Sequence, residues 1–246
     1  MPNIHIIAGC NGAGKTTASF TILPEDLKVK EFVNADSIAA GLSPFNVESV
    51  AIEAGRLMLQ RIQQLMEAKE DFAFETTLST RSYVPLIKKA KVKGYKITLL
   101  YFWLHSPEFA KQRVAKRVRR GGHNIPDEVV ERRYHRGISN LLNLYIPIAD
   151  NWKVIDNMVE PTIIAKGNNT ILNSELWNIF LKQRNVMEDK NIYLDEDSEK
   201  LLAGLKRAFK KLVETSAKLD EELVILDIDG KVKSVPAKDL LHRVQE

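Results

Sequence analysis

Apolar positions along the chain alternate between short continuous runs and runs with helical spacing. Five short apolar runs, each bounded by polar residues or glycine, are typical of buried parallel strands. They lie at residues 4–8, 31–34, 71–75, 96–104 and 152–156. Between them apolar residues recur every three or four positions, most clearly over residues 47–68, which predicts helices. This alternation of strand and helix indicates an α/β protein.

Local signals place the remaining elements. A helix over residues 82–93 is expected to end at Gly94, and another begins at Ser106 and Pro107, a capping residue followed by a proline in the first turn. A further helix is predicted from Pro126 to about Leu144. Residues 161–182 add a strand-like piece and a short helix.

A change of composition near residues 186–190 predicts a linker over residues 186–194. The chain then divides into a domain at residues 1–185 and a small segment at residues 195–246. In that segment, apolar residues fall on one face of a predicted helix, and two apolar runs flank Asp227–Gly230 as in a hairpin. The helix residues are Leu201, Leu202, Leu205, Phe209, Leu212 and Val213.

Residues 9–16 match the phosphate-binding loop pattern G-x-x-x-x-G-K-[ST]. The loop follows an apolar strand and precedes a segment without a helix breaker until Pro24, which is the context that the pattern requires. Glycines allow backbone N–H groups to point at a phosphate, Lys15 can reach the β- and γ-phosphates, and the Thr16 hydroxyl can bind Mg²⁺. The predicted nucleotide-binding residues are Gly9, Asn11, Gly12, Ala13, Gly14, Lys15, Thr16 and Thr17. We expect ATP rather than GTP.

Composition and charge narrow the classes of protein that the sequence can represent. The chain has 246 residues, a net charge of +4 and one cysteine, Cys10, so no disulfide can form within it. This fits a reducing cytoplasm, and no apolar run approaches the ~20 residues that cross a bilayer. Residues 111–136 hold nine Lys and Arg against three acids, an excess of six. Because no ladder of aromatic residues accompanies this cluster, we expect it to serve nucleotide phosphates rather than nucleic acid.

Candidate catalytic residues follow the strands, because ligands of open parallel sheets lie at the carboxyl ends of the strands. Asp36 can act as a general base for an acceptor hydroxyl, or it can cap a helix. Glu75 can position the acceptor, help to hold Mg²⁺ or simply face water. Thr77 and Arg81 can bind the acceptor or lie on the surface.

The basic cluster has the form of a lid, in which two predicted helices meet at Gly121 and Gly122. A closing lid can bring guanidinium groups to a transferring phosphoryl group. We expect Arg117, Arg120 and Arg133 to do so, whereas His123 is expected to make a hydrogen bond at the hinge.

Taken together, four motifs in order along residues 3–182 resemble the zeta-toxin family of phosphate-loop kinases, and most closely its branch of predicted ATPases. The motifs lie at residues 9–16, 34–36, 74–78, and 117–123 with 132–134. The resemblance implies a kinase-type three-layer sandwich with a five-stranded parallel core sheet and a helical lid. It also implies transfer of the ATP γ-phosphate to a sugar hydroxyl, as in UDP-N-acetylglucosamine. Matched by position, Asp36 corresponds to the family's general base and Lys15 to its phosphate-loop lysine. Glu75 and Thr77 correspond to residues that bind the acceptor sugar. Arg81 is a looser match to the family's motif.

Zeta-type toxins are commonly held inactive by a small antitoxin, so the resemblance implies that residues 195–246 act as an antitoxin-like segment in cis. The alternative is a helical brace remote from the site. Two other classes remain open for the whole chain: a catalytically silent nucleotide-binding interaction module and a nucleic-acid-dependent ATPase.

Overall fold

The computed structural model describes residues 1–119, 121–122, 124–168, 170–184, 210–226 and 232–244. The chain forms two compact units, Met1–Lys190 and Asn191–Glu246. Within the described residues, none of the helices combines the length and the apolar character needed to cross a membrane.

The first unit is built on one seven-stranded sheet with the order β2-β3-β1-β4-β5-β6-β7. The first five strands in this order are parallel, which confirms the predicted core, and β6 and β7 extend it in antiparallel fashion. The strands are β1 (Asn3–Gly9), β2 (Glu31–Val33), β3 (Phe72–Thr76), β4 (Lys96–Trp103), β5 (Asn151–Asp156), β6 (Thr162–Lys166) and β7 (Thr170–Ile171).

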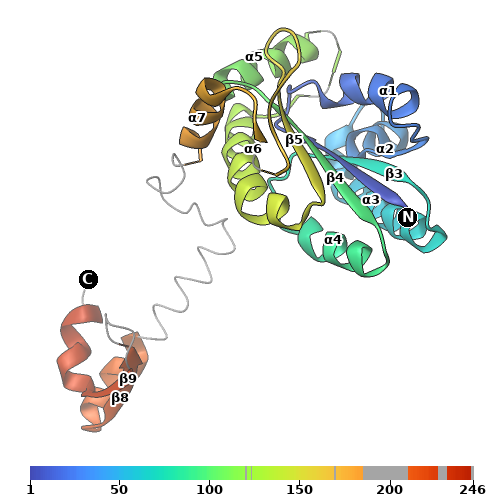
Figure 1. Ribbon diagram of the computed structural model, residues 1–246. Helices are drawn as coiled ribbons and strands as arrows, with labels where there is room; N and C mark the ends of the chain where they lie inside the picture. Colours follow the sequence, from blue (N-terminus) through green and yellow to red (C-terminus); the bar gives the residue numbers. More distant parts are fainter. Residues whose placement is uncertain (120, 123, 169, 185–209, 227–231, 245–246) are drawn as a thin grey trace. The chain divides into compact units, whose positions relative to one another are not determined.

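Helices connect the parallel strands and pack on both faces of the sheet (Figure 1). They are α1 (Lys15–Glu25), α2 (Ala35–Leu42), α3 (Ala51–Ala68), α4 (Tyr83–Val92), α5 (Pro107–Val118), α6 (Asp127–Asn140) and α7 (Ser174–Lys182). A 3-10 turn at Val47–Val50 leads into α3, and α6 continues into a π-helical turn at Leu141–Tyr145 and a 3-10 turn at Ile146–Ile148. No element was predicted over α2, apart from the alternative that Asp36 caps a helix.

The core lies on both sides of the central strands. Side chains of β1 are buried from Ile4 to Ala8, and those of β3 are buried from Phe72 to Phe74. Strand β1 pairs with β3 on one side and β4 on the other, so the end of β1 lies between the ends of its two neighbours. This arrangement fixes the phosphate loop at the centre of the carboxyl edge.

The second unit contains helical residues 210–218 and an antiparallel pair, β8 (Glu222–Leu226) with β9 (Val232–Pro236), followed by 3-10 turns at Ala237–Val244. The pairing of the two apolar runs is as predicted. On the helix, Val213 is buried whereas Leu212 is about half exposed. The residues Leu201, Leu202, Leu205 and Phe209 and the turn Asp227–Gly230 lie outside the described residues, and the predicted domain boundaries stay a prediction.

Candidate active site

The phosphate loop joins β1 to α1, and two of its glycines are required by its shape. Gly9 has a φ of +141°, and a Cβ atom there would lie 2.2 Å from the Phe102 carbonyl oxygen of β4. Gly14 has a φ of +84°, and its Cβ would lie 2.6 Å from Nδ2 of Asn157. That same Nδ2 donates to the Ala13 carbonyl at 2.7 Å. The glycines therefore allow close packing of the loop against the ends of β4 and β5.

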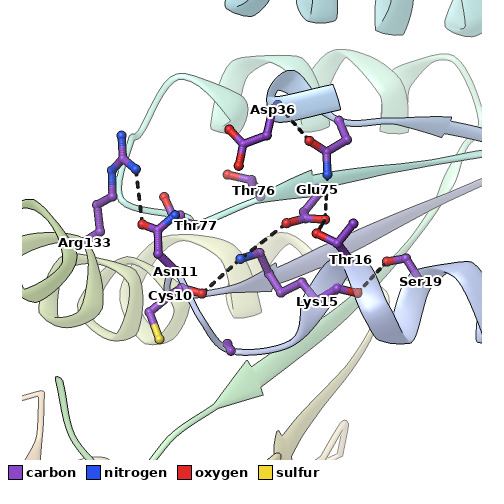
Figure 2. Close-up of polar contacts among 12 residues, drawn as sticks. Cys10, Asn11, Lys15, Thr16, Ser19, Asp36, Glu75, Thr76, Thr77 and Arg133 are labelled. Carbon is purple, nitrogen blue, oxygen red and sulfur yellow. Dashed lines mark hydrogen bonds and ion pairs between the residues drawn. The ribbon is translucent and has the colours of Figure 1, made fainter. Parts of the chain in front are cut away.

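Lys15 begins α1, and its side chain is buried. Its Nζ donates to the Cys10 carbonyl oxygen at 3.0 Å and lies 3.4 Å from Oε1 of Glu75 (Figure 2). The neighbouring Thr16 hydroxyl donates to Oε2 of Glu75 at 2.7 Å. Glu75, at the end of β3, thus contacts both Lys15 and Thr16, the phosphate-loop side chains expected to bind phosphate and Mg²⁺.

Asn34 joins this cluster to α2. Its Nδ2 donates to Oε2 of Glu75 at 2.8 Å, and its Oδ1 accepts from the backbone N–H groups of Asp36 and Ser37 at 2.8 and 3.2 Å. The capping residue of α2 is therefore Asn34, so the cap alternative for Asp36 is wrong. Asp36 lies in the first turn with its side chain exposed (Figure 2). In the sequence, the signal for this cap is Asn34 itself, an asparagine directly before the helix.

Arg133 reaches the phosphate loop from α6. Its NH1 donates to Oδ1 of Asn11 at 3.2 Å (Figure 2). Burial lowers the pKa of the Arg133 guanidinium, the negative charge of Asp36 raises it, and the neighbouring Arg132 lowers it. Arg133 thus reaches the loop from α6 at a place where the charge of Asp36, from α2, affects its pKa.

The other predicted arginines are placed differently. Arg117 is exposed near the end of α5, where Gly122 packs against it: a Cβ on Gly122 would lie 2.6 Å from the Arg117 Cγ. Arg120 and His123 lie outside the described residues. Arg113, which was not singled out from the sequence, donates to the Met158 carbonyl oxygen at 2.7 Å. The structure therefore brings Arg133 into contact with the phosphate loop.

The residues expected to bind an acceptor occupy the segment between β3 and α4. Thr77 is half-buried, and its hydroxyl lies 2.9 Å from that of Ser79. Arg81 is exposed two residues before α4.

The other predicted residues of the phosphate loop differ in exposure. Ala13 is buried, and Thr17 is exposed on α1. Cys10 is buried, and burial raises the pKa of its thiol to about 11.

A glycine-rich loop before a helix, with a buried lysine and a hydroxyl beside a carboxylate, can hold a nucleotide triphosphate at the helix N-terminus. A half-buried arginine and a nearby exposed carboxylate add the two kinds of charge used in phosphoryl transfer. The fold and this site define a phosphate-loop kinase.

The family model described as "Zeta toxin" matches residues 1–169, and a model described as "Domain of unknown function (DUF8506)" matches residues 189–246. The chain therefore belongs to the zeta toxin family and is a small-molecule kinase. A Haemophilus influenzae protein is 33% identical over 127 residues, which cover 51% of this chain and 88% of that protein.

Solved structures share the fold. A chain of the AvrRxo1-ORF1:-ORF2 crystal structure with ATP has a TM-score of 0.61 and 19% identity, over 79% of this chain and 66% of the other, so this chain spans about two thirds of that relative. A chain of the PezAT toxin-antitoxin system of Streptococcus pneumoniae has a TM-score of 0.56 and 16% identity, over 87% of each chain.

Proposed function

We propose that the chain transfers the γ-phosphate of ATP to a hydroxyl of a small acceptor, a nucleotide-sugar of the UDP-N-acetylglucosamine kind, and that its C-terminal segment inhibits it in cis. The observation that carries the first part is the convergence of Lys15, Thr16, Glu75 and Arg133 on one loop with an exposed Asp36 beside it.

Asp36 is the general base in this proposal. Asn34 performs the capping of α2, so this capping does not use the Asp36 carboxylate. An exposed carboxylate beside the phosphate loop can accept the proton of an acceptor hydroxyl as that hydroxyl attacks the γ-phosphate. Lys15 and Arg133 neutralise charge on the transferring group, with Arg117 and Arg120 as further candidates from the lid.

The residues present fit Mg²⁺, which prefers oxygen ligands and keeps several waters. The Thr16 hydroxyl would hold the ion, and Glu75 supplies a carboxylate 2.7 Å from that hydroxyl. When bound, Mg²⁺ would neutralise charge on the β- and γ-phosphates. Within the described residues no cluster of three or more His, Cys, Asp or Glu side chains offers a separate site for a metal ion.

Thr77 and Arg81 are the proposed acceptor ligands, and Glu75 is a third through its position at the end of β3. Hydroxyl and guanidinium groups suit a phosphorylated sugar, because both donate hydrogen bonds to its oxygens. The zeta toxin family supports an acceptor of this chemistry.

Substitution of the base tests the reaction. With γ-labelled ATP and a panel of acceptors that includes UDP-N-acetylglucosamine, we expect Asp36→Asn to lose about 10²-fold or more of the transfer rate while ATP binding is retained. Asp26→Asn, an exposed aspartate that follows α1, is the matched control. Retained transfer in Asp36→Asn would exclude the base role. Tight ATP binding by the parent chain without turnover would favour a silent binding module.

Truncation tests the inhibition. Residues 189–246 match a family model of their own and form a separate compact unit, as a fused regulatory segment would. We expect a chain that ends at Arg184 to transfer phosphate faster than the full chain at equal ATP. Equal rates from two well-folded proteins would favour a brace.

A further inference from the structure

One stripe of helix α6 contacts both loops of the site. Arg133, Gly137 and Asn140 are spaced by four and three residues and so share one face of the helix. Arg133 donates to Asn11 of the phosphate loop. The other two contact the loop between β3 and α4, residues 77–82, named here the β3–α4 loop. A single rigid element therefore spans the nucleotide side and the proposed acceptor side.

The contacts with the β3–α4 loop are made to its backbone carbonyl groups. Gly137 packs so closely that a Cβ there would lie 2.7 Å from the Thr77 carbonyl oxygen. Asn140 Nδ2 donates to the next carbonyl oxygen, that of Leu78, at 2.7 Å. At the end of the π-helical turn, the Tyr145 hydroxyl donates to the Thr80 carbonyl oxygen at 2.6 Å. Three carbonyl groups within four residues are thus held from α6 and the turn that follows it.

The residue that Asn140 holds has an unusual backbone. Leu78 has a φ of +55°, a left-handed conformation that a branched side chain adopts only where its surroundings enforce it. Its side chain is fully buried, and its N–H donates to the Thr76 hydroxyl at 3.1 Å. Asn140 holds the carbonyl side of the same residue. These contacts hold the chain in its turn directly after Thr77.

We propose that Asn140 is a positioning residue for the acceptor: by holding Leu78 it sets the place of Thr77 relative to the phosphate loop. This inference rests on the proposed function, in which Thr77 binds the acceptor. Asn140 itself is buried, so it acts through the loop and not by touching the acceptor. The sequence gives no local sign of this role, since Leu78 and Asn140 are 62 residues apart.

Kinetics with Asn140→Ala test the proposal in the full chain. The matched control is Asn143→Ala, which removes an exposed asparagine of the π-helical turn, whose Nδ2 lies 3.4 Å from the Ser139 hydroxyl. With UDP-N-acetylglucosamine as the acceptor, we expect the acceptor KM of Asn140→Ala to rise about tenfold or more, because a small misplacement weakens binding of an aligned group. The KM for ATP should change less than about twofold, and Asn143→Ala should change neither.

An unchanged acceptor KM would overturn the proposal. Equal rises in both KM values would also overturn it, because they would indicate a general loss of structure. If the unaltered chain transfers phosphate to no acceptor, the proposed function fails, and hydrogen exchange then decides the inference. We expect faster exchange of the Leu78, Ser79 and Ser82 amides in Asn140→Ala, with unchanged exchange at residues 9–16. Unchanged exchange in the β3–α4 loop would contradict it.

Discussion

Replacement of Glu75 by glutamine is the sharpest test of the buried cluster at the phosphate loop. The change keeps the shape of the side chain and removes its charge. Oε1 of Glu75 lies 3.4 Å from Nζ of Lys15, and the two side chains are only 10% and 6% exposed. With its oxygen at the Oε2 position, the amide can still accept from Thr16 and Asn34, but its NH₂ group then faces Lys15 Nζ. In the opposite orientation the NH₂ group faces Asn34 Nδ2.

The expected magnitude follows from burial. At an effective dielectric constant of about 20, two unit charges 3.4 Å apart attract each other by about 5 kcal/mol. Removal of one partner of a buried pair typically costs about 3–5 kcal/mol of unfolding free energy. Because glutamine retains part of the hydrogen bonding, we expect Glu75→Gln to lower the unfolding free energy by about 3 kcal/mol.

The matched control is Glu31→Gln, which breaks the ion pair with Arg61. This pair is shorter, at 2.7 Å, but its side chains are 41% and 46% exposed. Exposed pairs contribute about 0.2–1 kcal/mol, so burial and not distance should set the order of the two variants.

Denaturant unfolding in EDTA measures both variants with and without ATP. The phosphates of ATP supply negative charge beside Lys15 in place of the lost carboxylate, so ATP should raise the midpoint of Glu75→Gln more than that of the unaltered chain. Equal destabilisation by Glu75→Gln and Glu31→Gln would refute the electrostatic reasoning.

Three further predictions concern the central strand and its loop. Gly9→Ala should abolish soluble, folded protein, measured by expression and circular dichroism, because its Cβ would lie 2.2 Å from the Phe102 carbonyl oxygen; a folded, ATP-binding variant would contradict this. Burial lowers the pKa of His5 below 6.5, against the opposing effect of Asp71, so the unfolded chain gains a proton before the folded one as pH falls. Unfolding free energy should therefore decrease below about pH 6.5, and the decrease should be smaller in His5→Phe; equal pH dependence would rule this out. With a pKa of about 11 against a reference of 9.0, the Cys10 thiolate fraction at pH 8 is about one hundredth of that in the unfolded chain, so iodoacetamide should label native protein at least that much more slowly.

Much of the site could be predicted because its signals are local. The phosphate loop needs glycines at fixed spacing after a strand, and Gly9 and Gly14 both have positive φ values at close approaches. Asp36 was placed correctly at the carboxyl edge because β2 ends only three residues earlier. These inferences depend on neighbours in the chain, which a sequence records directly.

The remaining parts depend on contacts between distant residues. Glu75 meets Thr16 across 59 residues of chain, and Arg133 meets Asn11 across 122. Charge alone did not single out Arg133, because it lies in a basic cluster, and its contact with the phosphate loop depends on the packing of α6. The cap at Asn34 was a missed local signal, since an asparagine before a helix is a preferred N-cap.

The order of the sheet also bears on how the protein behaves at high concentration. Its two edges are β2, with three residues, and β7, with two. A short edge offers few unpaired N–H and C=O groups to a strand of another molecule, and β2 carries the charged Glu31. The first unit is thus a poor template for intermolecular strand addition, so its parallel core can be strongly apolar without promoting aggregation of the folded protein.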